Sequence, residues 1–204
     1  MISSNNKLVE HLCFLGRLKT KRIIEAFEKI DRAGFILPEY KNEAYGDHSL
    51  STGYGVTISQ PSTVAFMLEL LDLKPGQKVL DVGSGSGWTT ALIAHIVGDK
   101  GEVFGVEIID GLIKFGRENL KKHAFRHAKI LKARRGLGLA KKALFDRILV
   151  SAAASKIPDE LVEQLKVGGI MVIPINYSVF KIKREKDGYE KDGYYGFNFV
   201  PLKE

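Results

Sequence analysis

Residues 78–88 read KVLDVGSGSGW, a short apolar run that leads directly into three alternating glycines. The apolar run predicts a buried strand, and the stretch WTTALIAHIV at residues 88–97 predicts a helix. A strand, a glycine turn and a helix make the geometry of a nucleotide-type site at the carboxyl end of a parallel strand. Glycine permits the tight turn and lets backbone amides approach a ligand closely.

Two carboxylates accompany this turn. Glu107 ends the next predicted strand, where a carboxylate can accept hydrogen bonds from both hydroxyls of a ribose. Asp81 lies inside the first strand, where it can orient the turn or meet an ammonium group. Together with the alternation described below, these features predict a ribose-bearing cofactor. The alternative is a turn that only packs a helix on a strand. The G-x-G-x-G spacing differs from the G-x-G-x-x-G of dinucleotide-binding proteins, which disfavours an oxidoreductase.

Strand-like and helix-like stretches alternate further along the chain. EVFGVEI (102–108), AKILKA (128–133), FDRILVSAA (145–153) and GIMVIPI (169–175) predict strands, and 109–123 and 158–165 predict helices. Such alternation indicates a parallel sheet with crossover helices. Two Asp-Gly pairs, at 187–188 and 192–193, predict the turns of an antiparallel hairpin. We therefore predict an α/β, doubly wound, mostly parallel seven-stranded sheet with an antiparallel C-terminal hairpin at its edge.

The first 60 residues have a different pattern. Apolar residues recur at three- and four-residue steps over 5–34, which predicts helices, and Thr20 is a candidate N-cap. Proline and glycine then interrupt the pattern up to residue 61, which predicts a long loop of functional character. We predict one domain over 1–204, with an N-terminal helical section and lid (1–60) and a Rossmann-like core (61–204).

Composition limits the classes of protein. The chain has 204 residues, a net charge of +7 and a single cysteine, Cys13, which excludes an internal disulfide and disfavours a cysteine metal cluster. No apolar stretch is long enough to span a bilayer, and the N-terminus lacks the pattern of a signal peptide, so we expect a cytoplasmic protein. Between Glu118 and Asp146 there is no acidic residue but there are nine lysines and arginines. This basic segment predicts either a solvated face or a surface for nucleic acid.

Several motifs together resemble the protein-L-isoaspartate (D-aspartate) O-methyltransferases, a branch of the class I S-adenosylmethionine-dependent methyltransferases. The resemblance covers nearly the whole chain and rests above all on TISQP (57–61) and AAASKIP (152–158), with YGFNFVPL near the C-terminus. It implies S-adenosyl-L-methionine as cofactor, isoaspartyl-containing proteins as substrates, no metal, and a monomer. It also implies that residues 40–61 form a lid with glycine hinges.

The resemblance assigns site residues as well. It places the catalytic hydroxyl on Ser59, the methionine part of the cofactor on the glycine loop and the ribose on Glu107. The complete set expected around the cofactor is Thr57, Ser59, Gln60, Gly83, Ser84, Gly85, Ser86, Gly87, Glu107, Ile108 and Arg134. Methyl transfer to a carboxylate needs no strong base, because the carboxylate is already ionised at neutral pH. A hydroxyl such as that of Ser59, helped by Thr57, can orient it.

The chain departs from the family pattern at four places, and the first three of them lie around the expected site. Ala133, Arg134 and Arg135 stand where Gly-Asp-Gly is usual, and arginine cannot accept a hydrogen bond from adenine. Val56 replaces a glutamine, Asn176 a glycine and Lys203 a threonine. Three interpretations follow: Arg134 turns outward in a working repair enzyme, the enzyme methylates another substrate such as RNA through the 121–142 segment, or the chain is a catalytically impaired paralogue.

Overall fold

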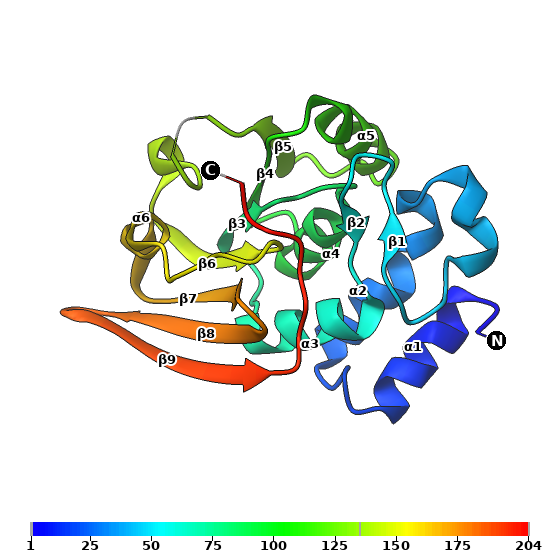
Figure 1. Ribbon diagram of the computed structural model, residues 1–204, viewed down its shortest axis with the longest axis horizontal. Helices are drawn as coiled ribbons and strands as arrows, with labels where there is room; N and C mark the ends of the chain where they lie inside the picture. The colour runs from blue at the N-terminus through cyan, green and yellow to red at the C-terminus, as the bar shows by residue number, and fades with distance from the viewer. Residues whose placement is uncertain (1, 135, 204) are drawn as a thin grey trace.

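The computed structural model describes residues 2–134 and 136–203, so Arg135 lies outside the described residues. Figure 1 shows the chain and its element labels. The helices are α1 (Asn5–Phe14), α2 (Lys21–Lys29), α3 (Pro61–Leu71), α4 (Trp88–Val97), α5 (Asp110–Lys121) and α6 (Asp159–Glu163), with 3₁₀ helices η1 (Arg32–Phe35), η2 (Pro38–Glu43) and η3 (Ala140–Lys142). The strands are β1 (Leu50–Ser51), β2 (Thr57–Ile58), β3 (Lys78–Val82), β4 (Glu102–Glu107), β5 (Ala128–Lys132), β6 (Phe145–Val150), β7 (Leu165–Ile175), β8 (Ser178–Glu185) and β9 (Gly188–Tyr195).

The main sheet has seven strands in the order β5-β4-β3-β6-β7-β8-β9. The five strands from β5 to β7 run parallel, and β8 and β9 are antiparallel additions at one edge. The strand order reverses direction beside β3, because the chain moves outward to β4 and β5 and then returns to β6. Ligand sites of parallel sheets form at such a switch point, outside the carboxyl ends of the strands. The predicted fold class is confirmed.

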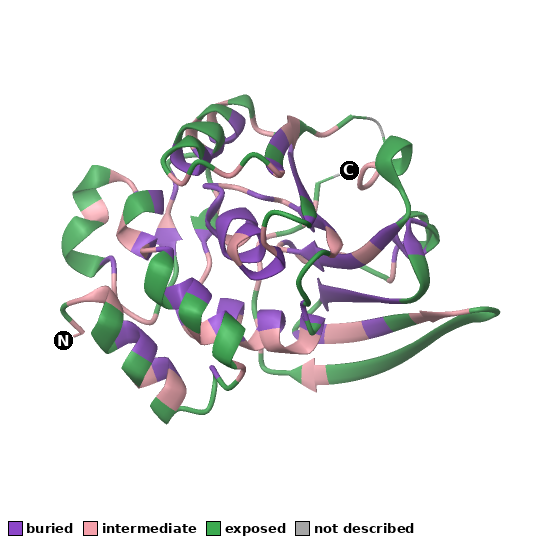
Figure 2. Ribbon diagram, turned by 180° about the vertical axis from the view of Figure 1, so that it is seen from behind, coloured by how far each residue is buried: buried purple, intermediate pink, exposed green. Residues whose placement is uncertain are grey.

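Alternating strand residues divide the core into two layers. Val79, Val103 and Leu149 face the layer formed with the helices α1 to α5, whereas Leu80 and Phe104 face the layer that contains α6. The central strands are buried on both faces, as Figure 2 shows, so they read as nearly continuous apolar runs in the sequence. The second layer has less helical cover than the first, because among the described helices α6 is the one that contributes buried residues to it.

The C-terminal hairpin corrects one prediction. Asp187 lies in the β8–β9 turn, as expected, but Asp192 and Gly193 lie inside β9 rather than in a turn. Gly193 pairs with Phe180, and a Cβ atom on Gly193 would approach the Phe180 ring to 2.9 Å. The glycine therefore makes room for a cross-strand aromatic ring instead of a change of direction.

The N-terminal section packs beside the sheet and reaches the site through a small two-stranded sheet of β1 and β2. These strands are short and antiparallel, with Leu50 opposite Ile58 and Ser51 opposite Thr57. The loop between them, 52–56, is the tip of the predicted lid. We call residues 50–58 the lid hairpin. None of the described helices combines the length and apolar character needed to cross a bilayer.

Candidate active site

The glycine loop lies between the end of β3 and the start of α4. Gly83, Gly85 and Gly87 all have positive φ angles, of 80°, 51° and 86°, which side chains rarely tolerate. Gly87 also meets α5 closely, because a Cβ atom there would lie 3.0 Å from the carbonyl oxygen of Gly116. Gly87 therefore has a packing role, while Gly85 turns its amide towards the next strand.

The carboxylate of Glu107 accepts a hydrogen bond from the Gly85 amide. Its Oε2 accepts a hydrogen bond from Gly85 N at 3.0 Å. Its Oε1 accepts from Ile108 N at 2.7 Å and from Ile109 N at 2.9 Å. Only 7% of Glu107 is exposed, so the protein compensates the buried charge with three backbone donors. A carboxylate has about four lone-pair sites, so acceptor capacity remains for a ligand hydroxyl.

Asp81 is fully buried beneath the loop. Its Oδ2 accepts hydrogen bonds from the hydroxyls of Thr89 at 2.7 Å and Thr90 at 2.6 Å, so it fixes the first turn of α4. Its Oδ1 and the Oγ of Ser84 are buried and have no hydrogen-bond partner among the described residues. Burial raises the pKa of Asp81 to about 6. Both orphaned oxygens lie at the loop that a ligand with an ammonium group would approach.

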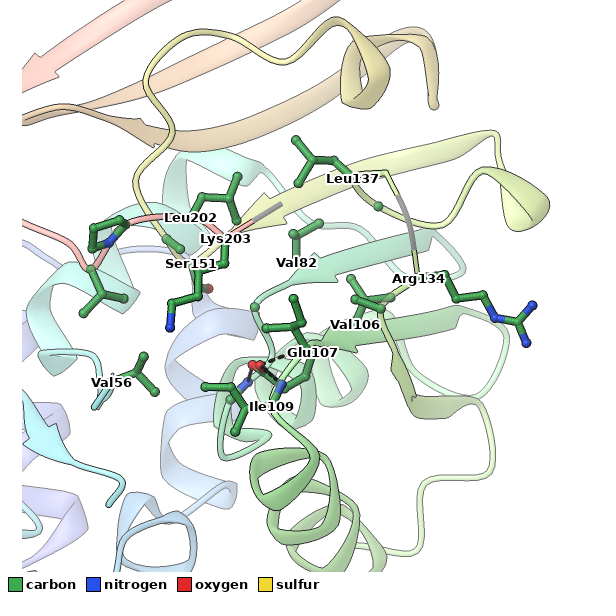
Figure 3. Close-up of a pocket in the computed structure, with 18 of the residues that line it drawn as sticks. Val56, Val82, Val106, Glu107, Ile109, Arg134, Leu137, Ser151, Leu202 and Lys203 are labelled. Carbon is green, nitrogen blue, oxygen red and sulfur yellow. Dashed lines mark hydrogen bonds between the residues drawn. The ribbon is translucent and has the colours of Figure 1, made fainter. Parts of the chain in front are cut away.

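A pocket opens at the carboxyl ends of β3, β4, β5 and β6, as Figure 3 shows. It encloses about 830 Å³ of space, counting the part open to solvent. Its walls are largely apolar, and its lining includes Val56, Thr57, Val82, Gly83, Gly85, Val106, Glu107, Ile108, Ile109, Ala133, Leu137, Ser151, Val200, Leu202 and Lys203. Glu107 is the acidic residue of this lining, and Lys203 is a basic one.

The pocket wall after β5 lacks the expected acid. Arg134 contributes to the wall, but its side chain is exposed and the guanidinium points away from the cavity in Figure 3. The loop residues 137–139 are fixed from α6 and its C-cap, because Glu160 Oε2 accepts from Leu137 N at 2.8 Å and Gln164 Oε1 accepts from Leu139 N at 2.7 Å. The loop thus keeps its place without a contact from the arginine, and Arg134 brings no charge into the cleft.

Arg32 holds the lid segment from beneath. The residue is fully buried, and its Nη1 donates to the carbonyl oxygens of Ala44 at 2.9 Å and Gly46 at 3.1 Å. Its Nη2 donates to the carbonyls of His48 at 2.8 Å and Ser59 at 3.2 Å. Burial lowers the pKa of Arg32 to about 10, which leaves the guanidinium charged at neutral pH. One cation therefore ties the 44–48 turn to the residue that follows the lid hairpin.

The tip of the lid hairpin rests on α5. The ring of Tyr54 covers Gly111 so closely that a Cβ atom there would collide with the ring. Gly111 is in the first turn of α5, directly after the Glu107 loop. The lid hairpin is thus closed over the carboxyl end of β4, and a glycine at 111 is what permits the contact.

The predicted site residues divide into two groups. The pocket lining contains Thr57, Gly83, Gly85, Glu107, Ile108 and Arg134. Ser59, Gln60, Ser84, Ser86 and Gly87 lie in or next to the lid hairpin and the glycine loop but outside the described lining. Sequence reasoning missed Ser151 at the end of β6 and the tail 200–203. The tail follows the edge hairpin and returns to the site, where Ala153 N donates to Val200 O at 2.8 Å.

The structure places three of the residues that differ from the family pattern. Val56 lines the pocket, and the Lys203 side chain points into it, as Figure 3 shows. Asn176 lies in the β7–β8 turn with a φ angle of 53°, a left-handed conformation that asparagine tolerates better than most residues. It therefore belongs to the hairpin rather than to the site.

Comparisons with known proteins agree with this geometry. Residues 3–204 match the family model described as protein-L-isoaspartate(D-aspartate) O-methyltransferase. A protein-L-isoaspartate O-methyltransferase of Methanopyrus kandleri is 42% identical over 98% of this chain and 91% of its own length, and one of Ignicoccus hospitalis is 39% identical over 100% and 99%. A crystal structure from Plasmodium falciparum, assigned to the same activity and solved with S-adenosyl-L-homocysteine, matches with a TM-score of 0.88 and 30% identity over 98% of this chain and 99% of that one. The chain belongs to the protein-L-isoaspartate (D-aspartate) O-methyltransferase family.

Proposed function

We propose that this protein transfers a methyl group from S-adenosyl-L-methionine to the carboxylate of L-isoaspartyl residues in damaged proteins, which is a repair reaction. Family membership gives the class of reaction. The observation that carries the proposal is the meeting of four separate segments in one pocket: the glycine loop, the Glu107 loop, the lid hairpin and the C-terminal tail. The proposal also includes action as a monomer in the cytoplasm.

The residues present fit an adenosyl cofactor. Apolar side chains such as Val82, Val106 and Leu137 offer a slot for the adenine ring. Glu107 is the acceptor for ribose hydroxyls, and the glycine loop offers backbone amides to the methionine carboxylate. The orphaned Oδ1 of Asp81 lacks the donor that an ammonium group would supply. When bound, the cofactor supplies an electrophilic methyl group on a sulfonium.

The chain itself has to orient the acceptor carboxylate and exclude water. A carboxylate is ionised at neutral pH, so positioning and desolvation make up most of the protein's task. Thr57 and Val56 bring the lid hairpin to the pocket mouth, and Tyr54 holds that hairpin against α5. We assign Ser59 as the hydroxyl that donates to the substrate carboxylate. Its backbone is held by Arg32, which leaves its side chain the freedom to meet a substrate.

The experiment compares Ser59→Ala with Ser62→Ala. Ser62 is the matched control, because it lies three residues further on and its hydroxyl makes no hydrogen bond within the described part of the chain. We expect Ser59→Ala to lower kcat for an isoaspartyl peptide roughly 10² to 10³-fold, the range for loss of one oriented donor. The affinity for S-adenosyl-L-homocysteine should stay within about twofold, because cofactor binding rests on other residues. Equal turnover in both variants would remove Ser59 from the mechanism.

Arg134 fits the first of the three interpretations from the sequence. An outward guanidinium neither repels the sulfonium nor contacts the adenine, so the adenine has to be held by the backbone and by apolar contacts. This supports a working cofactor site with one hydrogen bond fewer than usual, a difference of about 1 kcal/mol in binding free energy.

A further inference from the structure

The most basic part of the molecule lies outside the pocket, along the edge of the sheet. β5 is an edge strand, at the far side of the sheet from β9. An open groove of about 1060 Å³, counting space open to solvent, runs between β5 and the C-terminal half of α5. Its lining is Arg117, Leu120, Lys121, Ala124, Phe125, Arg126, Ala128, Lys129, Ile130 and Leu131. We call this feature the β5 groove.

The charge of the β5 groove is of one sign. Four of its lining residues are basic and none is acidic. Lys121, Arg126 and Lys129 are exposed and form no ion pair with any described residue, whereas the neighbouring Lys132 is paired with Asp110 at 2.8 Å. The unpaired cations thus keep their charge available for a partner.

The backbone and the floor of the β5 groove limit what that partner can be. The floor is apolar, with Leu120, Ala128 and Ile130 nearly buried. As an edge strand, β5 presents a row of backbone groups to the outside. The carbonyl of Ile130 is an exception in this row, because it already accepts from Arg117 Nε at 2.7 Å. The terminal nitrogens of Arg117 make no hydrogen bond to the residues described, so they stay available to a carboxylate. An extended polypeptide matches the apolar floor, the outward backbone groups of β5 and the basic side chains of the groove, since it offers apolar side chains, backbone partners and carboxylates.

The direction of β5 connects the groove to the proposed reaction. Beyond Lys132, the chain passes into Ala133 and Arg134, which belong to the pocket wall. A polypeptide lying along β5 therefore points towards the pocket mouth. We propose that the β5 groove is a docking site for an acidic, extended segment of the substrate polypeptide, which pairs with β5 and meets Arg126 and Lys129. The inference rests on the proposed function for the identity of this partner.

Direct binding gives the first test. Fluorescence anisotropy would measure a labelled peptide with alternating acidic and β-branched residues and no isoaspartate, so that binding does not depend on methyl transfer. We expect Arg126→Glu with Lys129→Glu to weaken binding about tenfold or more at low salt. Lys186→Glu with Lys191→Glu is the matched control, because both lysines are exposed on the distant hairpin and the change in net charge is the same. Equal losses in the two double variants would overturn the proposal.

The pairing with the strand has its own test. The same peptide carrying N-methyl groups at alternate residues keeps its charge but loses the donors along one edge. We expect one of the two N-methylation registers to bind at least about fivefold more weakly, because edge pairing needs those donors. Equal affinity for the N-methylated and unmodified peptides would overturn edge-strand docking. Displacement of the peptide by a single-stranded RNA that binds more tightly, with loss of RNA binding in the Arg126→Glu/Lys129→Glu variant, would assign the groove to nucleic acid instead.

Steady-state kinetics then connect docking to turnover. Two isoaspartyl peptides would be compared, one with an acidic flanking segment and one with serine and glutamine in its place. In the wild type and the hairpin control, the acidic peptide should have a KM about tenfold lower. In the groove variant the two KM values should converge while kcat is unchanged. If neither peptide is methylated but groove-dependent binding persists, the proposed function fails and the docking site stands; if methylation proceeds with equal KM values throughout, the docking site fails alone.

Discussion

Arg32 offers the sharpest test of how the fold positions the lid. We predict that Arg32→Met lowers the free energy of unfolding. It should also lower kcat by a larger factor than it lowers the affinity for the cofactor. The guanidinium is the donor for four carbonyls, those of Ala44, Gly46, His48 and Ser59. Methionine fills part of the volume of the arginine stem but donates no hydrogen bond.

The magnitude follows from the burial of the acceptors. Ala44 is buried, so its carbonyl loses its partner without access to water, at a cost of about 1–3 kcal/mol. Gly46, His48 and Ser59 are partly exposed, and water can replace part of what their carbonyls lose. With the loss of packing beside Trp88, over whose ring the guanidinium lies at 5.6 Å, the total is about 3–5 kcal/mol. Small domains have about 5–15 kcal/mol of stability, so the variant should still fold at low temperature.

The assay is urea unfolding combined with kinetics. Arg22→Met is the control, because Arg22 lies in α2 of the same N-terminal section and makes a single bond, 2.9 Å, to the carbonyl of Leu73. We expect the unfolding free energy of Arg22→Met to fall by about 1 kcal/mol or less. Arg32→Met should lower kcat at least about tenfold while S-adenosyl-L-homocysteine affinity changes less than about threefold. Arg32→Lys keeps the charge and should recover part of kcat. A loss of stability below 1 kcal/mol with unchanged kcat would refute the reasoning.

Three further predictions follow from the pocket. Burial holds the pKa of Asp81 near 6, above its unfolded value of about 4, so its contribution to stability is present below about pH 4 and is lost as the pH rises through 6. Asp81→Asn should therefore raise the unfolding free energy at pH 7 by up to about 3 kcal/mol. The calorimetric affinity for S-adenosyl-L-homocysteine should rise with pH through 6 in the wild type and stay constant with pH in the variant. Gly111→Ala should stabilise α5 by up to about 1 kcal/mol in thermal unfolding but displace Tyr54 and raise KM, whereas an unchanged KM would show that the Tyr54 contact is dispensable. Arg134→Ala should leave the S-adenosyl-L-homocysteine affinity within about twofold at low and high salt, because the guanidinium is exposed, and a larger change would place the arginine in the cleft.

The sheet was predictable because its signal is local. Central strands buried on both faces produce apolar runs, and crossover helices separate them at regular spacing. The glycine loop and Glu107 were predictable for the same reason, since each lies at the end of such a run. Gly193 shows the limit of this reasoning. An Asp-Gly pair indicates a turn from local preference alone, but here Phe180 on the neighbouring strand determines what the glycine does.

The rest of the site depends on contacts between distant parts of the chain. The tail 200–203 enters the pocket only because it returns from the edge hairpin across the ends of the central strands, where Ser151 directly follows β6. The sequence also does not show which way the Arg134 side chain points, since a long side chain at this position can extend either into solvent or into the cleft. Arg32 carries no motif that predicts its four carbonyl partners. The roles assigned to Ser59 and the other cofactor residues stay predictions.

The central claim is tested most directly by one measurement of methyl transfer. Purified protein would be incubated with methyl-labelled S-adenosyl-L-methionine and either of two peptides that differ in one residue, an L-isoaspartate or a normal L-aspartate. We predict that label enters the isoaspartyl peptide as a base-labile ester and stays at background in the aspartyl peptide. Label in neither peptide, from a folded protein that binds S-adenosyl-L-homocysteine, would contradict the proposed function.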